Sequence, residues 1–492
     1  MSITSRPTIV YSDETYSPVF REIPYESPCL VYERVKSSHS LLLESIKGTD
    51  EIARYSFIGI DPYLQFKAKD GVIEIEINGK KTLSARNPLH RLKELVFGYR
   101  QVIVDGLPPF QGGAAGMLSY DFVRYIEKIP ANAADDLDVP DAHFFFFDRL
   151  ISFDHRTKKA WIVVCPGARE MALGYSSIEG SREEHKQNAL KCIDKIADRL
   201  ARGEAAGDFR GDASSGRKRV VRQETDKLAY MSMVEKAKEY IAAGDIFQAN
   251  LSLRVSAEIG DGDPFRLYRI LRDINPAPFA TFVDFGDYQI VGSSPERLVR
   301  VRGNTVDTRP IAGTRPRGVS LTEDEVMRAD LLLNEKERAE HIMLVDLERN
   351  DLGRISDYGT VVVDEMMATE NYSHVIHIVS NVKGRLAEGK DCFSVIKATF
   401  PGGTITGVPK VRCMEIIDEI EPVRRGPYTG SLGYIGFNGN MDLNIIIRTF
   451  LIKNGRAYIQ AGAGIVADSD PEREYYECLK KAEALIRTLE LI

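Results

Sequence analysis

Short runs of alternating apolar and polar residues dominate the part of the chain before residue 203. YLQFKAK, VIEIEING and RLISFDH are three such runs, and Gly, Asp and Pro turns separate them. A period of two places alternate side chains on opposite faces of an extended strand. This region is therefore predicted to form mainly antiparallel strands, with one helix over residues 88–97.

Helical and extended patterns alternate in the part of the chain after residue 219. Residues 225–243 repeat apolar positions at helical spacing and stop at Gly244, a residue type that often follows a helix. The run IFQANLSLRVSAEI then predicts a strand. One long helix is expected to begin near Thr322, with Glu325 completing a capping box, and to continue through AEHIMLVDLERND.

The sequence also predicts the start of the last helix, the fold class and the position of a linker. The last helix is predicted to start at Asp470, with Pro471 at its first position, where proline sacrifices no backbone hydrogen bond. Strands and helices do not alternate strictly, which favours an α+β fold over a doubly wound parallel sheet. A stretch rich in Gly, Ala, Ser and charge predicts a linker at residues 204–219, between regions 1–203 and 220–492.

Length, composition and charge narrow the class of protein. A chain of 492 residues exceeds what one core usually supports, so one very large unit or two closely packed units are expected. The net charge of -7 offers no basic field for nucleic acid or anionic lipid, and neither is expected as a partner. No apolar stretch is long enough to span a bilayer and no secretory leader pattern is present, so a cytoplasmic location is predicted.

Acidic residues are the first candidates for chemistry. They are Glu296 in VGSSPERL, Glu340 in KERAEHIML, and Glu474 and Glu477 in DPEREYYECLKKA. Glu474, Glu477 and Lys481 share one face of the predicted last helix, and two carboxylates from different helices would suffice for Mg2+. Spacing alone favours a simpler interpretation, an exposed Glu477–Lys481 ion pair worth about 0.2 to 0.5 kcal/mol.

The remaining motifs are weaker evidence for a functional site when each is considered alone. The segments PGGTITGVPK and QAGAGIV could bring backbone N–H groups close to an anion, but they lack P-loop spacing and are more often tight turns. Arg448 follows an apolar run and is expected to have a carboxylate partner, from protein or substrate. The histidines lack the spacing of a zinc helix. The six cysteines include no C-x-x-C pair and indicate reduced thiols.

Five motifs in order carry a resemblance to a known family. RPIAGTRPRG, AEHIMLVDLERNDLGR, HVIHIVSNVKGRL, FPGGTITGVPK and QAGAGIVADSDPEREYYE together closely resemble the chorismate-utilising enzymes. The resemblance covers nearly the whole region after the linker. It implies an α+β sandwich of large, mostly antiparallel sheets flanked by helices, with chorismate and Mg2+ between them.

The resemblance also implies roles for single residues. Glu340 and Glu477 would bind Mg2+, with Glu474 close to the metal, and Glu296 would protonate the departing C4 hydroxyl. His377 would lie near the ring carboxylate and assist the later pyruvate elimination. The positions that match the family's substrate surroundings are Tyr428 and Arg448, for the enolpyruvyl carboxylate, and Thr404, Gly462, Gly464 and Lys481.

Two positions distinguish activities within the family. Members that add water carry a lysine base where this chain has Gln248, and glutamine cannot take a proton, so amination is expected. Aminodeoxychorismate synthases typically carry a lysine nucleophile where this chain has Ala312, so amination at C2, giving anthranilate, is expected. The alternatives are an aminodeoxychorismate synthase, because VDLERNDLGR and NPAPF also occur in that group, and a non-catalytic tryptophan-binding protein.

An N-terminal segment suggests regulation. LLLESIKGTDEIARYSFIG resembles the tryptophan-binding element of anthranilate synthases, in which Glu44 and Ser45 would contact the effector. A second element, NPAPFA, contains Asn275, Pro276 and Phe279, and it departs from the usual pattern by having Phe and Ala in place of Tyr and Met. Tryptophan inhibition is expected; without the resemblance, an ordinary strand end with a polar turn would be the better interpretation.

Ammonia in this family normally comes from a glutaminase with a cysteine in a glycine-rich elbow. None of the six cysteines here lies in such an elbow. A separate glutamine amidotransferase subunit, and hence a hetero-oligomer, is therefore predicted.

Overall fold

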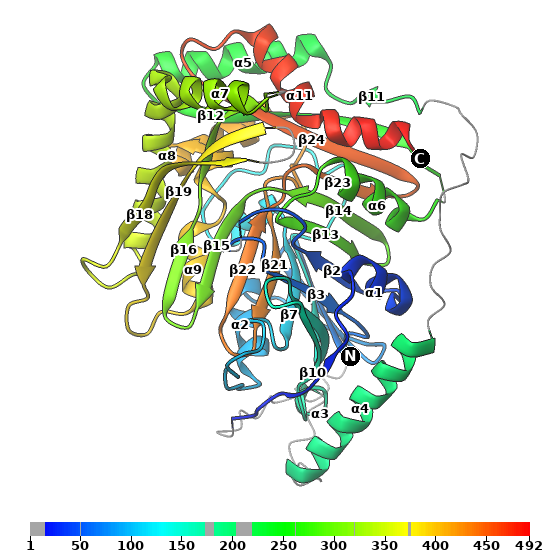
Figure 1. Ribbon diagram of the computed structural model, residues 1–492. Helices are drawn as coiled ribbons and strands as arrows, with labels where there is room; N and C mark the ends of the chain where they lie inside the picture. The colour runs from blue at the N-terminus through cyan, green and yellow to red at the C-terminus, as the bar shows by residue number, and fades with distance from the viewer. Residues whose placement is uncertain are drawn as a thin grey trace.

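The structure is a computed structural model that describes residues 15–49, 51–172, 182–202, 219–260, 262–318, 320–371 and 375–492. Two large antiparallel sheets of twelve strands each form its centre, and helices flank them (Figure 1). The predicted α+β architecture is confirmed. No helix in these ranges is long and apolar enough to cross a membrane.

The first sheet contains, in spatial order, β1 (Val19–Ile23), β10 (Lys159–Val164), β9 (Arg149–Asp154), β3 (Tyr55–Gly59), β2 (Leu41–Glu44), β13 (Phe279–Asp284), β14 (Tyr288–Ser294), β23 (Thr449–Lys453), β24 (Arg456–Ile465), β12 (Gln248–Glu258) and β11 (Arg222–Gln223), with β20 (Gly407–Val408) paired to β12. The second contains β17 (Ile311–Pro316), β19 (Val375–Arg385), β16 (Thr305–Thr308), β15 (Arg297–Arg302), β22 (Met441–Ile445), β21 (Ser431–Gly436), β7 (Gly113–Leu118), β8 (Ala142–Phe147), β4 (Leu64–Lys69), β5 (Val72–Ile77) and β6 (Lys80–Ser84), with β18 (Val362–Asn371) paired to β19.

The helices are α1 (Pro28–Val35), α2 (Pro88–Phe97), α3 (Ala168–Ala172), α4 (Arg182–Arg202), α5 (Lys227–Ala242), α6 (Pro264–Ile274), α7 (Leu321–Leu333), α8 (Glu335–Gly353), α9 (Cys392–Thr399), α10 (Lys410–Ile420) and α11 (Pro471–Glu490). Two 3-10 turns, η1 (Tyr120–Tyr125) and η2 (Gly403–Ile405), complete the described elements.

Local pattern explains many of these elements. The alternating runs form β4, β5 and β9, and burial in β4 alternates residue by residue. Helix α2 has the predicted bounds and is capped by Asn87, which accepts a hydrogen bond from the backbone N–H of His90. Helix α5 is followed by Gly244 at a φ of 84°, and Asp470 caps α11 as predicted.

The single long helix expected from Thr322 is wrong. Ser320, not Thr322, caps α7, and the chain leaves the helix at Asn334, whose φ of −69° and ψ of 114° are extended. The Asn334 side chain then accepts a hydrogen bond from the N–H of Glu337 and starts α8. A residue that favours N-caps therefore divides the pattern into two helices.

The sequence regions on either side of the linker share both sheets. Strand β2 pairs with β13 in the first sheet, and β7 pairs with β21 in the second. Residues 203–218, nearly all of the predicted linker, lie outside the described residues. Because each sheet needs strands from both regions, the two regions complete one sandwich rather than two separate cores.

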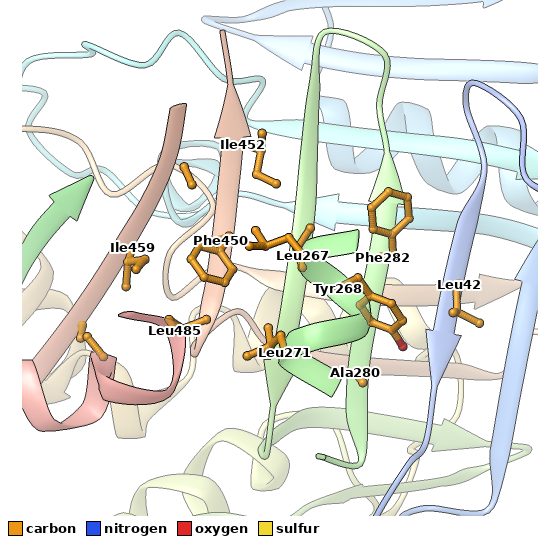
Figure 2. Packing of buried hydrophobic residues seen from close by; sticks show 14 of the residues in the cluster. Leu42, Leu267, Tyr268, Leu271, Ala280, Phe282, Phe450, Ile452, Ile459 and Leu485 are labelled. Carbon is orange, nitrogen blue, oxygen red and sulfur yellow. The ribbon is translucent and has the colours of Figure 1, made fainter. Parts of the chain in front are cut away.

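The largest core cluster fixes two helices against the first sheet. Leu267 and Leu271 of α6 and Leu485 of α11 project toward Phe450 and Ile459 of the sheet (Figure 2). Each fully buried side chain of this kind contributes about 1.5 to 3 kcal/mol. This packing sets where the polar face of α11 lies relative to the sheet.

Candidate active site

Strands β12 and β24 form the floor of the candidate site. Asn250 pairs with Gly464 and Ser252 with Gly462 across the two strands. A Cβ at Gly464 would lie 2.4 Å from Nε2 of Gln248, and one at Gly462 would lie 2.6 Å from Oδ1 of Asn250 and 2.8 Å from the Tyr428 hydroxyl. The two glycines therefore leave room for polar side chains that converge from neighbouring segments.

Helix α8 brings an acidic side chain over this floor. Glu340 accepts a hydrogen bond of 3.1 Å from Nε2 of Gln248, whose side chain is buried. Burial raises the pKa of Glu340, the Gln248 bond lowers it, and the carboxylates of Glu337 and Glu477 raise it further. The net upward shift means that a nearby positive charge would stabilise the ionised form.

Helix α11 contributes a charge pair to the same site. Lys481 lies 2.8 Å from Oε1 of Glu477 and donates a 3.0 Å hydrogen bond to the carbonyl of Gly462. Burial lowers the pKa of Lys481, but Glu477 more than offsets this, and the net shift is upward. The Glu477–Lys481 ion pair expected from the spacing is therefore present. Lys481 also contacts Gly462, in the floor of the site.

Glu296 occupies the turn between β14 and β15. Its side chain is 6% exposed, and Oε1 accepts a 3.0 Å hydrogen bond from the hydroxyl of Thr404 on η2. Burial raises the pKa of Glu296 to about 7, although the Thr404 bond, the N–H of Ile311 and the charge of Arg448 act to lower it. The carboxyl thus carries its proton part of the time at neutral pH, as a general acid requires.

His377 on β19 faces the same charged groups. Its Nδ1 lies 3.1 Å from the carbonyl oxygen of Gly313, which can only accept, so this nitrogen carries the hydrogen. Burial lowers the pKa of His377 to about 4, and the charges of Arg448 and Lys481 add to the effect. The imidazole is neutral at neutral pH.

The chain reaches Arg448 through an uncommon backbone conformation. Arg448 lies between β22 and β23 with a φ of 51°, a left-handed value that is uncommon for a residue other than glycine. Its charge acts on both Glu296 and His377, so the guanidinium lies within electrostatic range of both. Strain of this kind is often found at functional sites.

Two further predicted positions are Ala312 and Glu474. Ala312 on β17 is 8% exposed and pairs with Ile378, the neighbour of His377, so it offers only a methyl group beside the site. Glu474 acts electrostatically on Tyr230 and Cys478. Among the described residues no three His, Cys, Asp or Glu side chains form a metal-binding group. Metal binding by Glu340, Glu474 and Glu477 therefore stays a prediction.

A cavity separate from the candidate active site lies between the two sheets. Glu44, Ser45 and Phe279 line it from the first sheet. Residues of the second sheet that line it are Arg302, Leu432, Gly433, Tyr434, Asp442 and Asn444. The buried carboxylate of Glu44 accepts hydrogen bonds from the Tyr268 hydroxyl at 2.6 Å and Arg272 at 2.9 Å.

The other two residues of the expected effector element lie outside the lining of this cavity. Asn275 donates to the hydroxyl of Ser293 at 3.2 Å, and neither Asn275 nor Pro276 lines the cavity. Their contribution is to the backbone that leads into β13.

Two polar residues near the candidate site were not predicted from the sequence. Asn250 follows Gln248 by two residues on one strand, a spacing that places both side chains on one face and could have revealed it. Glu348 on α8 is 4% exposed, and its pKa is raised to about 8 by burial, by Asp351 and by Glu296. No spacing signal predicts its position behind Glu296.

Comparisons with known proteins identify the family of this chain. Residues 38–487 match the family described as chorismate binding enzyme. An aminodeoxychorismate synthase component 1 of Bacillus subtilis is 43% identical over 96% of this chain and 97% of its own length. An anthranilate synthase component 1 of Acetivibrio thermocellus is 44% identical over 98% of this chain and 97% of its own length.

A solved structure has a similar fold. The crystal structure of anthranilate synthase component I from Streptococcus pneumoniae superposes with a TM-score of 0.77 at 39% identity, covering 94% of this chain and 98% of that chain. Because the family match spans nearly the whole chain, and relatives that are 43% and 44% identical cover 96% and 98% of it, this protein belongs to the chorismate-binding enzyme family.

Proposed function

We propose that this chain is the chorismate-using subunit of an anthranilate synthase, which converts chorismate and ammonia to anthranilate and pyruvate. The observation that carries the proposal is the environment of Gln248. Its Nε2 is committed to Glu340, and its buried Oε1 has no hydrogen-bond partner among the described residues. An acceptor so placed can receive an N–H of ammonia while the ammonia lone pair remains free to attack.

The same residue argues against addition of water. Water needs a base to remove a proton as it attacks, and a side-chain amide has no basic lone pair at neutral pH. Lys481 is near, but its pKa is raised, so it remains a cation. The site is therefore suited to a nucleophile that attacks without prior deprotonation.

The remaining residues account for bond breaking. As the ammonia nitrogen bonds to C2, the ring double bonds shift and the C4–O bond breaks, and Glu296 supplies the proton that lets the oxygen leave as water. The nitrogen at C2 then gives up its extra proton to solvent. Transfer of the C2 proton to the methylene carbon of the enolpyruvyl group, with cleavage of the C3–O bond, releases pyruvate and forms the aromatic ring. Neutral His377, beside Gly313, would serve this second stage.

We further propose that Glu340 and Glu477 hold Mg2+, with Glu474 close to the metal and its waters. The two carboxylates fit such an ion because the charge of Glu477 raises the pKa of Glu340, a repulsion that a divalent cation would relieve. When bound, Mg2+ neutralises the ring carboxylate of the substrate and draws electron density from the ring.

A second candidate function is aminodeoxychorismate synthesis. It is favoured by the Bacillus subtilis relative of that name, which is 43% identical to this chain. Ala312 argues against it, because a methyl group cannot act as the nucleophile that redirects the amine to C4. A non-catalytic tryptophan-binding protein is a weaker alternative, because Glu296, Glu340 and Glu477 are all present.

The proposal includes a partner and an effector. A separate glutaminase subunit would supply ammonia, and several relatives are named as component 1 of a synthase. L-Tryptophan would bind in the cavity between the sheets, against Ser45 and Phe279, and inhibit the enzyme.

The test is to incubate the purified chain with chorismate, Mg2+ and excess ammonium at alkaline pH and to identify the product. Anthranilate with pyruvate would support the proposal. Accumulation of 4-amino-4-deoxychorismate would favour the second candidate, a hydroxylated product would refute the role of Gln248, and no turnover would favour the binding protein.

A further inference from the structure

Two side-chain amides of β12 present acceptor oxygens to the candidate active site. Gln248 and Asn250 are two residues apart, so both side chains project from one face of the strand. Oε1 of Gln248 and Oδ1 of Asn250 are both buried, and neither accepts a hydrogen bond from the part of the chain that the structure describes. Buried acceptors in this state are unfavourable unless a ligand supplies the hydrogens.

The glycines of β24 place both amides over the same floor. A Cβ at Gly464 would lie 2.4 Å from Nε2 of Gln248, and a Cβ at Gly462 would lie 2.6 Å from Oδ1 of Asn250. Gly462 and Gly464 are also two residues apart, so they share one face of β24. The two amides therefore lie on the same side of the neighbouring strand.

Hydrogen bonds to other segments hold both residues in place. The N–H of Asn250 donates to the carbonyl of Thr406 at 2.9 Å, and its carbonyl accepts from Nη2 of Arg425 at 2.6 Å. Nε2 of Gln248 donates to Glu340 at 3.1 Å, so Oε1 is the end of that amide left for a ligand. The backbone of Asn250 and the amide of Gln248 are thus ordered before a ligand arrives, which lowers the entropy cost of binding.

Two acceptor oxygens require a ligand with hydrogen-bond donors. In the proposed reaction the ionised carboxylates and the ether oxygen of chorismate carry no donor, and its single hydroxyl, at C4, belongs to Glu296. Ammonia carries three N–H donors and one lone pair. Two of its N–H groups can bond to the two amide oxygens while the lone pair stays free for attack.

The positions of the two amides suit a single nitrogen beside C2. Side chains two residues apart on a strand start about 6.6 Å apart, and a nitrogen that donates to two oxygens at about 2.9 Å spans up to about 5.8 Å between them. Gln248 is bonded to Glu340, the proposed metal ligand, and C2 is the ring neighbour of the carbon whose carboxylate that metal would hold. A nitrogen between the two amides would therefore stand beside the carbon that it attacks.

We propose that Asn250 is the second acceptor of the ammonia site and, with Gln248, aims the ammonia lone pair at C2; this role rests on the proposed function of the chain. As the nitrogen bonds to C2 it gains positive charge, the C4–O bond breaks, and the oxygen leaves as water with the proton of Glu296. The N–H donors become stronger as this charge develops. Both amide oxygens therefore stabilise the transition state more than the ground state.

Three substitutions at Asn250 separate an acceptor from a structural role. Asn250→Ala and Asn250→Leu remove the oxygen, whereas Asn250→Asp keeps an acceptor oxygen at the same place. The control is Asn304→Leu, at an exposed position in the turn between β15 and β16, which should leave every constant unchanged. Chorismate consumption is measured at one alkaline pH with chorismate saturating and ammonium varied, and chorismate binding is measured by calorimetry without ammonium.

Asn250→Ala and Asn250→Leu should lower kcat/KM for ammonia about 10- to 100-fold, because a hydrogen bond that gains charge in the transition state is lost. In both variants the dissociation constant for chorismate should stay within about twofold of wild type. Asn250→Asp should use ammonia at least about tenfold better than Asn250→Leu, because an acceptor oxygen remains. A kcat/KM for ammonia within about twofold of wild type in folded Asn250→Ala would overturn the proposal, as would a change in chorismate affinity alone.

Failure of the proposed function would look different. If wild type consumes chorismate in an ammonium-dependent reaction and Asn250→Leu matches it, only the role of Asn250 is wrong. If wild type shows no ammonium-dependent consumption of chorismate, the proposed function is wrong and the role of Asn250 fails with it.

Discussion

The hydroxyl of Thr404 lies 3.0 Å from Oε1 of Glu296 and donates to it, which ties the buried acid to the short helix η2. Burial raises the pKa of Glu296 to about 7, and this hydrogen bond acts in the opposite direction because it stabilises the carboxylate. The balance keeps the acid near the midpoint of its titration at neutral pH, where it both holds a proton and can release it.

Thr404→Val should shift to higher pH the alkaline fall in kcat/KM for chorismate. Without the hydroxyl, the pKa of Glu296 rises, so the fall in rate that accompanies its ionisation should shift upward by roughly one pH unit. The measurement is kcat/KM for chorismate against pH, with Thr305→Val, at an exposed site, as the control. A limb that stays in place or moves to lower pH would count against the assignment.

Glu296→Gln should lose activity and gain alkaline stability. The rate should fall by about 10²- to 10⁴-fold, the usual contribution of a general acid. The folded pKa of about 7 lies above the ordinary value of 4.5, so the stability of wild type relative to the variant is full below pH 4.5 and is lost as pH rises through 7. The melting temperature of the variant should rise relative to that of wild type between pH 4 and about pH 8. An equal difference in melting temperature at both pH values would refute the raised pKa of Glu296.

His377 should stay neutral throughout the working range. Burial and the charges of Arg448 and Lys481 hold its pKa at about 4. The ring resonances of His377, assigned by comparison with His377→Asn, should therefore not titrate between about pH 5.5 and 8, a range that includes the ordinary histidine pKa of about 6.5. A midpoint near that value would mean that the imidazole charges during catalysis.

Removal of Mg2+ should abolish turnover, and Glu340→Gln should weaken the response to the metal. The Mg2+ concentration for half-maximal activity should rise at least about tenfold, because one carboxylate ligand is lost. Glu335→Gln, exposed in the first turn of the same helix, is the matched control. Full activity in EDTA, or equal Mg2+ dependence in both variants, would contradict the proposed metal site.

Ser45→Leu should remove tryptophan inhibition without reducing ammonia-dependent turnover. Ser45 lines the cavity between the sheets and donates a 2.9 Å hydrogen bond to the carbonyl of Pro278, so a larger side chain would enter the effector space. The readout is the inhibition curve for L-tryptophan, with exposed Ser17→Leu as the control. Unchanged inhibition in Ser45→Leu would place the effector elsewhere.

Local pattern by itself determined much of the architecture. The two-residue period of LQFKAK yields β4, and Asp470 with Pro471 starts α11, because strand faces and helix caps depend on neighbours in sequence. The ordered motifs also identified the family, because they occur in this chain in the family's order. The division at Asn334 was missed because its capping role competes with a continuing helical pattern.

Tertiary structure alone decided the electrostatics and the pairing. Glu296, Thr404 and Arg448 come from separate segments, and the proton on Glu296 depends on burial that no spacing reveals. The bond from Gln248 to Glu340, 92 residues away, likewise exists only because β12 and α8 meet. Sequence specifies which groups are available, whereas desolvation and charge depend on distances between remote segments, and these exist only once the chain has folded.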